Sequence, residues 1–351
     1  MGNGNLYWIL VMKELANKPS STTFYMKLTI AFLTGGYSGE AEISYKSAIT
    51  IEQNIDSDRW ELYKIDITKE GWFYALPSGQ KIYVDKNDFS LFINEEKITF
   101  DAVLIGIHGT PGEDGKLQGY LDTMHIPYTS CDSATSALTF NKRYTVAVAA
   151  FAGMHVAKSL HLFKDIPVQP ADILRQLQLP LFVKPNNGGS SLGISKVKAL
   201  EALQAALDKA FHEDDQVLVE ECISGREFTI GVFKSKGKII ALPITEIISK
   251  NEFFDFEAKY EGASEEITPA VVEVSIAEKV RNEARKAYTV FNCKGIVRID
   301  FIYNEASGNA YLLEINTVPG QSAASLVPQQ VAAMGMSLKE FYSTLIEECF
   351  L

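Results

Sequence analysis

Two short segments near the C-terminus, residues 295–302 and 310–317, constrain the fold of this chain more than any other feature. Each alternates apolar and polar side chains over much of its length, which is the pattern of a half-buried β-strand. The run at 304–309 between them is rich in turn-forming residues. We therefore expect an antiparallel hairpin.

The polar residues of this hairpin should share one face, because side chains alternate across a strand. That face would carry Arg298, Asp300, Glu314 and Asn316, with Leu313 and Ile315 on the opposite face of the second strand. A hairpin symmetric about residue 307 sets Asp300 across from Glu314. The same register sets Arg298 across from Asn316.

Two carboxylates directly opposite each other on paired strands repel each other unless a cation lies between them. Oxygen ligands suit a hard divalent ion, most simply Mg²⁺, and Asn316 adds a third oxygen donor to Asp300 and Glu314. The alternative is a solvated, salt-bridged hairpin face. The asparagine and the Pro319–Gly320 pair directly after it favour the metal site.

The charge balance limits the partners of the chain. Its 351 residues carry a formal net charge of −11, which argues against nucleic acid or an anionic membrane as the main partner. No segment approaches the roughly 18 apolar residues of a membrane span. The four cysteines are far apart and form no CxxC pair, which favours reduced thiols in a cytosolic protein over a zinc site.

The chain alternates strands and helices from Met26 onward, which favours an α/β fold. Residues 1–25 are expected to form a poorly ordered N-terminal extension, with a helix packed on the domain as the competing interpretation. We predict three further units, at 26–130, 131–223 and 224–351. In the first unit, strands at 28–34 and 102–107 end in loops at the sheet edge where α/β folds bind ligands, and a helix spans 41–54.

The glycine-rich loop at 188–193 could lie over phosphate groups. It is not a Walker loop, because Ile194 stands where that motif requires lysine and a strand follows instead of a helix. Lys184 ends the preceding strand and would supply positive charge. A solvent-exposed hairpin turn is the alternative. The loop at 35–39 does not have the GxGxxG spacing of a dinucleotide site.

The order of five motifs along the chain resembles that of the ATP-grasp superfamily. These motifs are Lys142, 184–193, 217–221, 225–229 and the hairpin. Four more motifs, at 35–44, 108–115, 256–260 and 316–328, narrow the resemblance to D-alanine–D-alanine ligases. The resemblance extends from Met26 to the C-terminus. The resemblance implies a three-domain ATP-grasp fold, with α+β lobes that clamp ATP and an N-terminal Rossmann-like open sheet.

The resemblance also implies how ATP is held. Asp300, Glu314 and Asn316 would bind two Mg²⁺ ions, with Mn²⁺ as a substitute. Phosphate charge would be neutralised by Lys142, Lys184 and Lys259, beneath a lid formed by Gly189, Ser190 and Ser191. The adenine would meet the linker strand at Glu220, Glu221 and Ile223, and the ribose would meet Glu227.

The substrate residues follow from the same resemblance. Glu40 would bind the ammonium of the first D-alanine, although a carboxylate at a helix N-terminus is also favoured as a cap. His108 would lie beside the acyl centre, although a lone histidine is more often structural. Arg298 and the Gly320 N–H would stabilise the oxyanion. Ser325 would bind the carboxylate of the second D-alanine, and Ser190 and Tyr260 would link Glu40 to its amine.

The implied reaction joins two D-alanines through an acyl phosphate, for peptidoglycan precursors, the cell wall and cell shape. A bacterial cytoplasmic homodimer is implied as well. Two departures leave pocket shape open: Cys222 stands where many relatives have an aromatic residue, and 321–324 is atypical. Another ATP-grasp enzyme with a different acceptor, or a non-catalytic ATP-binding protein, are the alternatives. Tyr260 favours an amine over D-lactate as acceptor.

Overall fold

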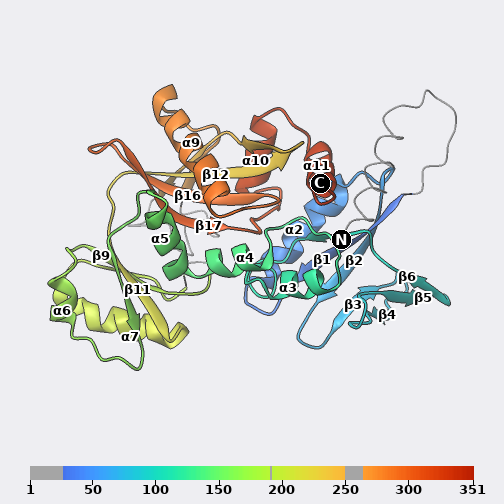
Figure 1. The fold of residues 1–351 in the computed structure, drawn as a ribbon, viewed down its shortest axis with the longest axis horizontal. Coiled ribbons are helices and arrows are strands. Elements are labelled where there is room, and N and C mark those ends of the chain that lie inside the picture. The colour runs from blue at the N-terminus through green and yellow to red at the C-terminus, as the bar shows by residue number, and fades with distance from the viewer. Residues whose placement is uncertain (1–26, 190–191, 250–263) are drawn as a thin grey trace.

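Three main β-sheets follow one another along the chain in the computed structural model, which describes residues 27–189, 192–249 and 264–351 (Figure 1). The mixed arrangement of sheets and helices confirms the predicted α/β class. The N-terminal extension expected at 1–25 lies outside the described residues. Among the residues described, no helix has the length and apolarity needed to cross a bilayer.

The first sheet has the strand order β4-β3-β2-β1-β7, and its three parallel strands bring two loops to one edge. β1 (Leu28–Gly35) is almost wholly buried, and it leads into α2 (Ala41–Asn54), as predicted. The other elements are β2 (Trp60–Ile67), β3 (Trp72–Ala75), β4 (Lys81–Tyr83), β7 (Ala102–Ile105) and α3 (Lys116–Thr123), with a small hairpin of β5 (Leu91–Ile93) and β6 (Glu96–Ile98).

The second sheet is antiparallel, with the order β10-β9-β11-β8. Leu181 and Val183 on one strand, and Val217 and Val219 on the next, face a core of their own. The alternate residues Lys184 and Glu220 face the other side. The elements are β8 (Ser159–Phe163), α6 (Pro170–Leu174), β9 (Leu181–Pro185), β10 (Ser195–Val197), a 3-10 turn (Leu200–Ala202), α7 (Leu203–Glu213) and β11 (Gln216–Glu221).

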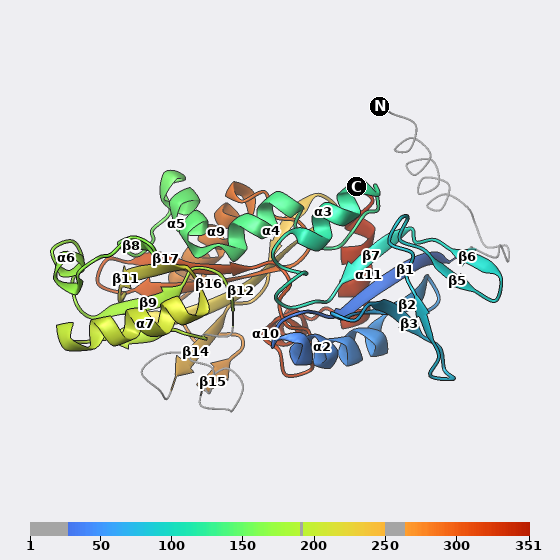
Figure 2. The ribbon, with the colours of Figure 1, turned by 90° about the horizontal axis from the view of Figure 1, so that it is seen from below.

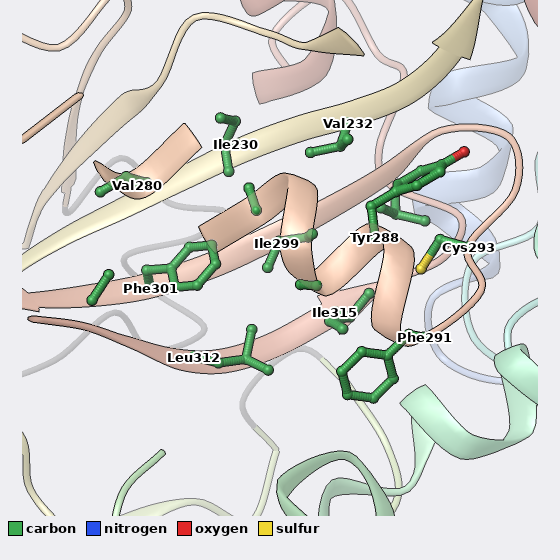
Figure 3. Close-up of a cluster of buried hydrophobic side chains, with 14 of the residues drawn as sticks. Ile230, Val232, Val280, Tyr288, Phe291, Cys293, Ile299, Phe301, Leu312 and Ile315 are labelled. Atoms are coloured by element: carbon green, nitrogen blue, oxygen red, sulfur yellow. The ribbon is translucent and has the colours of Figure 1, made fainter. Parts of the chain in front are cut away.

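The third sheet contains the predicted hairpin, and α9 (Val274–Val290) packs against it. Its main path runs β15-β14-β12-β16-β17, and β13 pairs with β12. Figure 3 shows the buried side chains between this sheet and α9. The strands are β12 (Arg226–Ser235), β13 (Lys238–Ala241), β14 (Thr245–Ser249), β15 (Ser264–Ile267), β16 (Val297–Asn304) and β17 (Asn309–Asn316).

The register of this hairpin confirms the predicted pairs: Asp300 lies opposite Glu314, and Arg298 lies opposite Asn316. The prediction for Leu313 is wrong. The register shifts after Asp300, so that Leu313 is the extra residue of a β-bulge. Leu312 therefore joins Ile315 in the buried core (Figure 3). Leu313 remains half-buried.

Four further helices tie the sheets together. α4 (Ser133–Phe140) and α5 (Lys142–Phe151) pack on β17, whereas α10 (Leu326–Ala333) and α11 (Leu338–Glu348) lie between the first and third sheets (Figure 2). α11 contacts both α2 and β12, so its apolar side chains share one core with β1, α2 and Phe233. The predicted domain boundaries at 130 and 223 remain a prediction.

Candidate active site

A cavity of about 310 Å³ lies where the N-terminal part, the glycine-rich loop and the third sheet meet. Nine of the predicted site residues line it, although the chain separates them widely. They are Glu40, His108, Lys142, Gly189, Arg298, Glu314, Asn316, Gly320 and Ser325.

Glu40 occupies the N-cap position of α2, yet its side chain makes no capping hydrogen bond. The carboxylate lies close to two glycines instead. A methyl group added at Gly189 would lie 2.6 Å from Glu40 Oε1, and one added at Gly109 would lie 2.5 Å from Oε2. The carboxylate is therefore placed between the loop after β7 and the glycine-rich loop, which favours a ligand-binding role over capping.

His108 follows β7 and is buried. Its Nε2 lies 3.0 Å from Ser47 Oγ, and its backbone N–H donates to Ser44 Oγ over 2.9 Å. Burial lowers the pKa of His108 to about 4, helped by the positive charge of Arg298 and opposed by a hydrogen bond to the Val318 backbone. The ring is therefore neutral at physiological pH.

This pKa predicts a pH-dependent stability. Between pH 6.5 and about 4 the unfolded chain binds a proton at His108 that the folded chain does not, so stability falls as the pH falls. Urea unfolding of wild type and His108→Asn across this range isolates the effect. We expect the wild type to lose about 3 kcal/mol relative to the variant. Parallel pH profiles for the two proteins would contradict the burial of a neutral ring.

Glu113 is a site residue that the motifs did not single out. It lines the cavity and accepts backbone N–H groups from Gly109 at 2.7 Å and from Val318 at 3.1 Å. Burial, and then the nearby charge of Glu40, raise the pKa of Glu113 to about 8. The side chain thus joins the loop after β7 to the loop after β17. Glu113 is half-buried, and its position depends on tertiary packing that a single sequence does not reveal.

Two lysines lie along the glycine-rich loop. Lys142 Nζ donates to the Gly188 carbonyl over 2.7 Å. Lys184 is ion-paired with Glu220 on the neighbouring strand. Burial alone would lower the Lys184 pKa, but the carboxylates of Glu220, Glu314 and Glu227 outweigh it and raise the pKa. Lys184 therefore stays charged where the second and third sheets face each other.

The hairpin carboxylates are held by Arg298. Its Nε and Nη2 atoms lie 3.1 Å from the two oxygens of Asp300, and Nη2 lies 3.9 Å from Glu314. Asn316 donates to Asp300 over 3.3 Å. Thr229, the last residue of the 225–229 motif, had no predicted role and also donates to Asp300. A guanidinium therefore balances part of the negative charge that the predicted metal would balance.

The oxygens of the hairpin fit a hard cation held jointly with a ligand. Within the described ranges, no group of three or more His, Cys, Asp or Glu side chains is placed to hold a metal by itself. Two carboxylates and an amide suit Mg²⁺ that takes its remaining ligands from phosphate and water.

Gly320 and Ser325 lie together at the start of α10. A methyl group at Gly320 would lie 2.8 Å from Ser325 Oγ, which is also 2.8 Å from Ser322 Oγ. Ser325 is the N-cap of α10, and its side chain makes no capping hydrogen bond. Hydroxyl groups at a helix N-terminus suit a carboxylate.

The remaining predicted residues lie outside the cavity lining. Glu221 accepts the backbone N–H of Gln178 at 2.9 Å, so its carboxylate serves the local fold. Ile223 follows β11 and is half-buried, and Glu227 lies on β12. Asp300 does not line the cavity itself, but it is ion-paired with Arg298, which does. The predictions for Ser190, Ser191, Lys259 and Tyr260 fall outside the described residues.

Family models match nearly the whole chain. The model described as "D-ala D-ala ligase N-terminus" matches residues 29–131, and "D-ala D-ala ligase C-terminus" matches residues 140–347. The D-alanine–D-alanine ligase of Parabacteroides distasonis is 45% identical over 323 residues, which are 92% of this chain and 98% of the relative. That of Flavobacterium johnsoniae is 45% identical over 318 residues, 91% and 98% of the two chains.

Solved structures are similar too. The VanG D-Ala:D-Ser ligase from Enterococcus faecalis has a TM-score of 0.83 at 30% identity, covering 93% of this chain and 100% of its own. The Bacillus anthracis D-alanine–D-alanine ligase complexed with ATP has a TM-score of 0.73 at 27% identity, covering 92% and 97%.

Proposed function

Since this chain belongs to the D-alanine–D-alanine ligase family, we propose that it joins two D-alanines at the cavity described above while ATP is converted to ADP and phosphate. The observation that carries the proposal is the shared cavity itself. Glu40, the hairpin face and the Gly320–Ser325 turn come from distant parts of the chain and line one space. Each has the chemistry that one part of this reaction needs.

The first step forms an acyl phosphate. A carboxylate oxygen of the first D-alanine, whose ammonium lies at Glu40, bonds to the terminal phosphorus of ATP, and ADP leaves. Charge on the phosphoryl oxygens must be balanced, so positioning and electrostatics carry most of the catalysis. Lys142 and Lys184 supply positive charge to the phosphates, with Lys259 as a third lysine. Gly189, Ser190 and Ser191 are proposed to cover the phosphates.

Metal ions would add to this balance. Asp300, Glu314 and Asn316 would hold two Mg²⁺ ions, or Mn²⁺ in their place, and the bound ions would neutralise phosphate charge. Arg298 would then be released from part of its contact with the carboxylates.

The second step forms the peptide bond. The amine of the second D-alanine bonds to the acyl carbon. As the tetrahedral intermediate collapses, phosphate leaves and takes up the proton that the amine gives up. Arg298 and the Gly320 N–H would stabilise the oxyanion, while Ser325 would hold the incoming carboxylate. Ser190 and Tyr260 are proposed to connect Glu40 with the amine.

The nucleotide would lie between the second and third sheets. The backbone at Glu220, Glu221 and Ile223 is proposed to meet the adenine, because the Glu220 and Glu221 side chains already have protein partners. Glu227 is proposed to accept the ribose hydroxyls. We also propose a homodimer in the bacterial cytoplasm, a place in peptidoglycan precursor synthesis, and the four-part division at residues 25, 130 and 223.

Phosphate release with ATP and D-alanine tests the proposal, with L-alanine and D-lactate as comparison substrates. D-serine is included because one similar structure is a D-Ala:D-Ser ligase. We expect D-alanine-dependent phosphate release and D-alanyl-D-alanine by mass spectrometry. A preference for another acceptor would replace the D-alanine assignment, and release that no amino acid stimulates would overturn the ligase proposal.

Gly189→Ala tests the placement of Glu40. The new methyl group would lie 2.6 Å from Glu40 Oε1, so the carboxylate must move away from its place in the cavity. We expect the KM for D-alanine to rise about tenfold, the size of one weakened charged contact, with little change in melting temperature. Gly39→Ala is the matched control, because a methyl group there meets nothing within 4 Å. Equal KM values for the two variants would contradict the role of Glu40.

A further inference from the structure

One face of α2 is polar although it is packed inside the protein. Glu40, Ser44 and Ser47 are spaced so that they lie in a row along the helix. Both serines are fully buried, where a packed helix face normally carries apolar side chains. Each serine hydroxyl bonds to a loop at the edge of the cavity. The row therefore does more than fill space.

Ser47 has two partners from two different loops. The backbone N–H of Gln321 donates to Ser47 Oγ over 3.0 Å, and Ser47 Oγ lies 3.0 Å from His108 Nε2. A hydroxyl has a single hydrogen to donate. Since the Gln321 contact uses Ser47 as an acceptor, that hydrogen is available for the histidine ring.

The ring of His108 completes this assignment. A neutral imidazole has one N–H and one bare nitrogen. The Ser47 hydroxyl directs its hydrogen to the ring, and the Val318 backbone favours a protonated nitrogen elsewhere on the ring. Nε2 faces Ser47, which leaves Nδ1 as the nitrogen that carries the hydrogen. Nε2 is then the acceptor of the Ser47 hydroxyl.

Ser47 thus joins three parts of the site. It shares a helix with Glu40, it fixes the ring that follows β7, and it binds the residue directly after Gly320. Glu113 bridges the same two loops from another side, through Gly109 and Val318. The positive charge of Arg298, which also lines the cavity, acts on the ring.

We propose that Ser47 is a positioning residue of the reaction proposed above. Its hydroxyl holds His108 as the Nδ1-protonated tautomer and fixes the 320–321 peptide against α2. His108 then supports the acyl site as a neutral ring held by Ser47 and carries no proton between substrates.

Nitrogen NMR of protein labelled with [¹⁵N]histidine tests the tautomer without any turnover. The chain has five histidines, and His108→Gln identifies the relevant signals. In wild type we expect a protonated Nδ1 and a bare Nε2 that persist well below pH 6.5. In Ser47→Ala we expect the Nε2 signal of His108 to shift and the other histidines to stay unchanged. Ser136→Ala, a fully buried hydroxyl in α4, is the matched control and should leave His108 unchanged.

Kinetics then test the positioning role. Ser47→Ala should lower kcat by about a hundredfold, the scale of a catalytic group displaced by 1 Å, while the KM for ATP changes less than about twofold. Ser47→Thr keeps the hydroxyl and should recover most of the loss. Equal losses in Ser47→Ala and Ser47→Thr would mean that packing alone matters, and would overturn the proposal.

The wild-type spectrum decides the case even if Ser47→Ala fails to fold. A His108 ring protonated at Nε2, or one that titrates near pH 6.5, would overturn the proposal. The expected tautomer in a protein that lacks ligase activity would overturn the proposed function and support the Ser47 assignment. The two failures are therefore distinguishable.

Discussion

Asp300→Asn is expected to abolish D-alanine-dependent phosphate release while the fold stays intact. The asparagine keeps the shape of the side chain, and its carbonyl oxygen can still accept from Thr229. It removes the negative charge that the predicted cation requires. Glu314→Gln removes the charge directly opposite on the paired strand and should have the same result.

Phosphate release and thermal unfolding of both variants provide the measurement. Glu305→Gln is the control, because it removes an equal charge from the exposed turn of the same hairpin. We expect that control to behave as wild type. Near-normal activity in either Asp300→Asn or Glu314→Gln would withdraw the metal assignment.

Arg298→Met is expected to separate catalysis from metal binding. Arg298 pairs with Asp300 and lies 3.9 Å from Glu314, so it competes with a cation for the same oxygens. Its loss should leave the Mg²⁺ concentration for half-maximal activity unchanged or lower. Turnover should still fall about 10²–10³-fold, the scale of losing one oxyanion donor.

A Mg²⁺ titration of phosphate release in Arg298→Met and wild type makes this measurement. Arg281→Met is the control, since Arg281 pairs with Glu278 on the surface of α9. A Mg²⁺ requirement that rises sharply in Arg298→Met would show that the arginine supports the metal site and has no separate part in the oxyanion.

The sequence predicted the two strands of the hairpin, and in the first sheet it predicted β1, β7 and α2 but not β2, β3 and β4. The pairing of Asp300 with Glu314 followed from strand alternation, because the turn is short and its register is nearly symmetric. The sequence did not predict that Leu312 lies in the core in place of Leu313. A β-bulge adds one residue to a strand, and the alternation of apolar and polar residues does not show where it is added.

The candidate site was predictable where the family resemblance gives a residue a role, and less so where tertiary packing creates the chemistry. Glu113 and Asp114 are neighbours in one acidic loop, and only the fold shows that Glu113 is the one that spans two loops. Ser47 resembles any exposed helix serine in the sequence. Its buried partners, His108 and Gln321, lie 61 and 274 residues away.

The second sheet has a hydrophobic core of its own, drawn from residues 162–219, whereas α2, α11 and the third sheet share one core. Rotating the second sheet as a rigid body would therefore break polar contacts at its border, such as Lys142 to Gly188, without unpacking buried apolar side chains. The part of the enzyme that is proposed to bind the two D-alanines would stay assembled throughout the catalytic cycle. ADP release would require the second sheet to move away from the third, where the nucleotide is proposed to lie. The rate of this opening would limit kcat independently of the bond-forming steps.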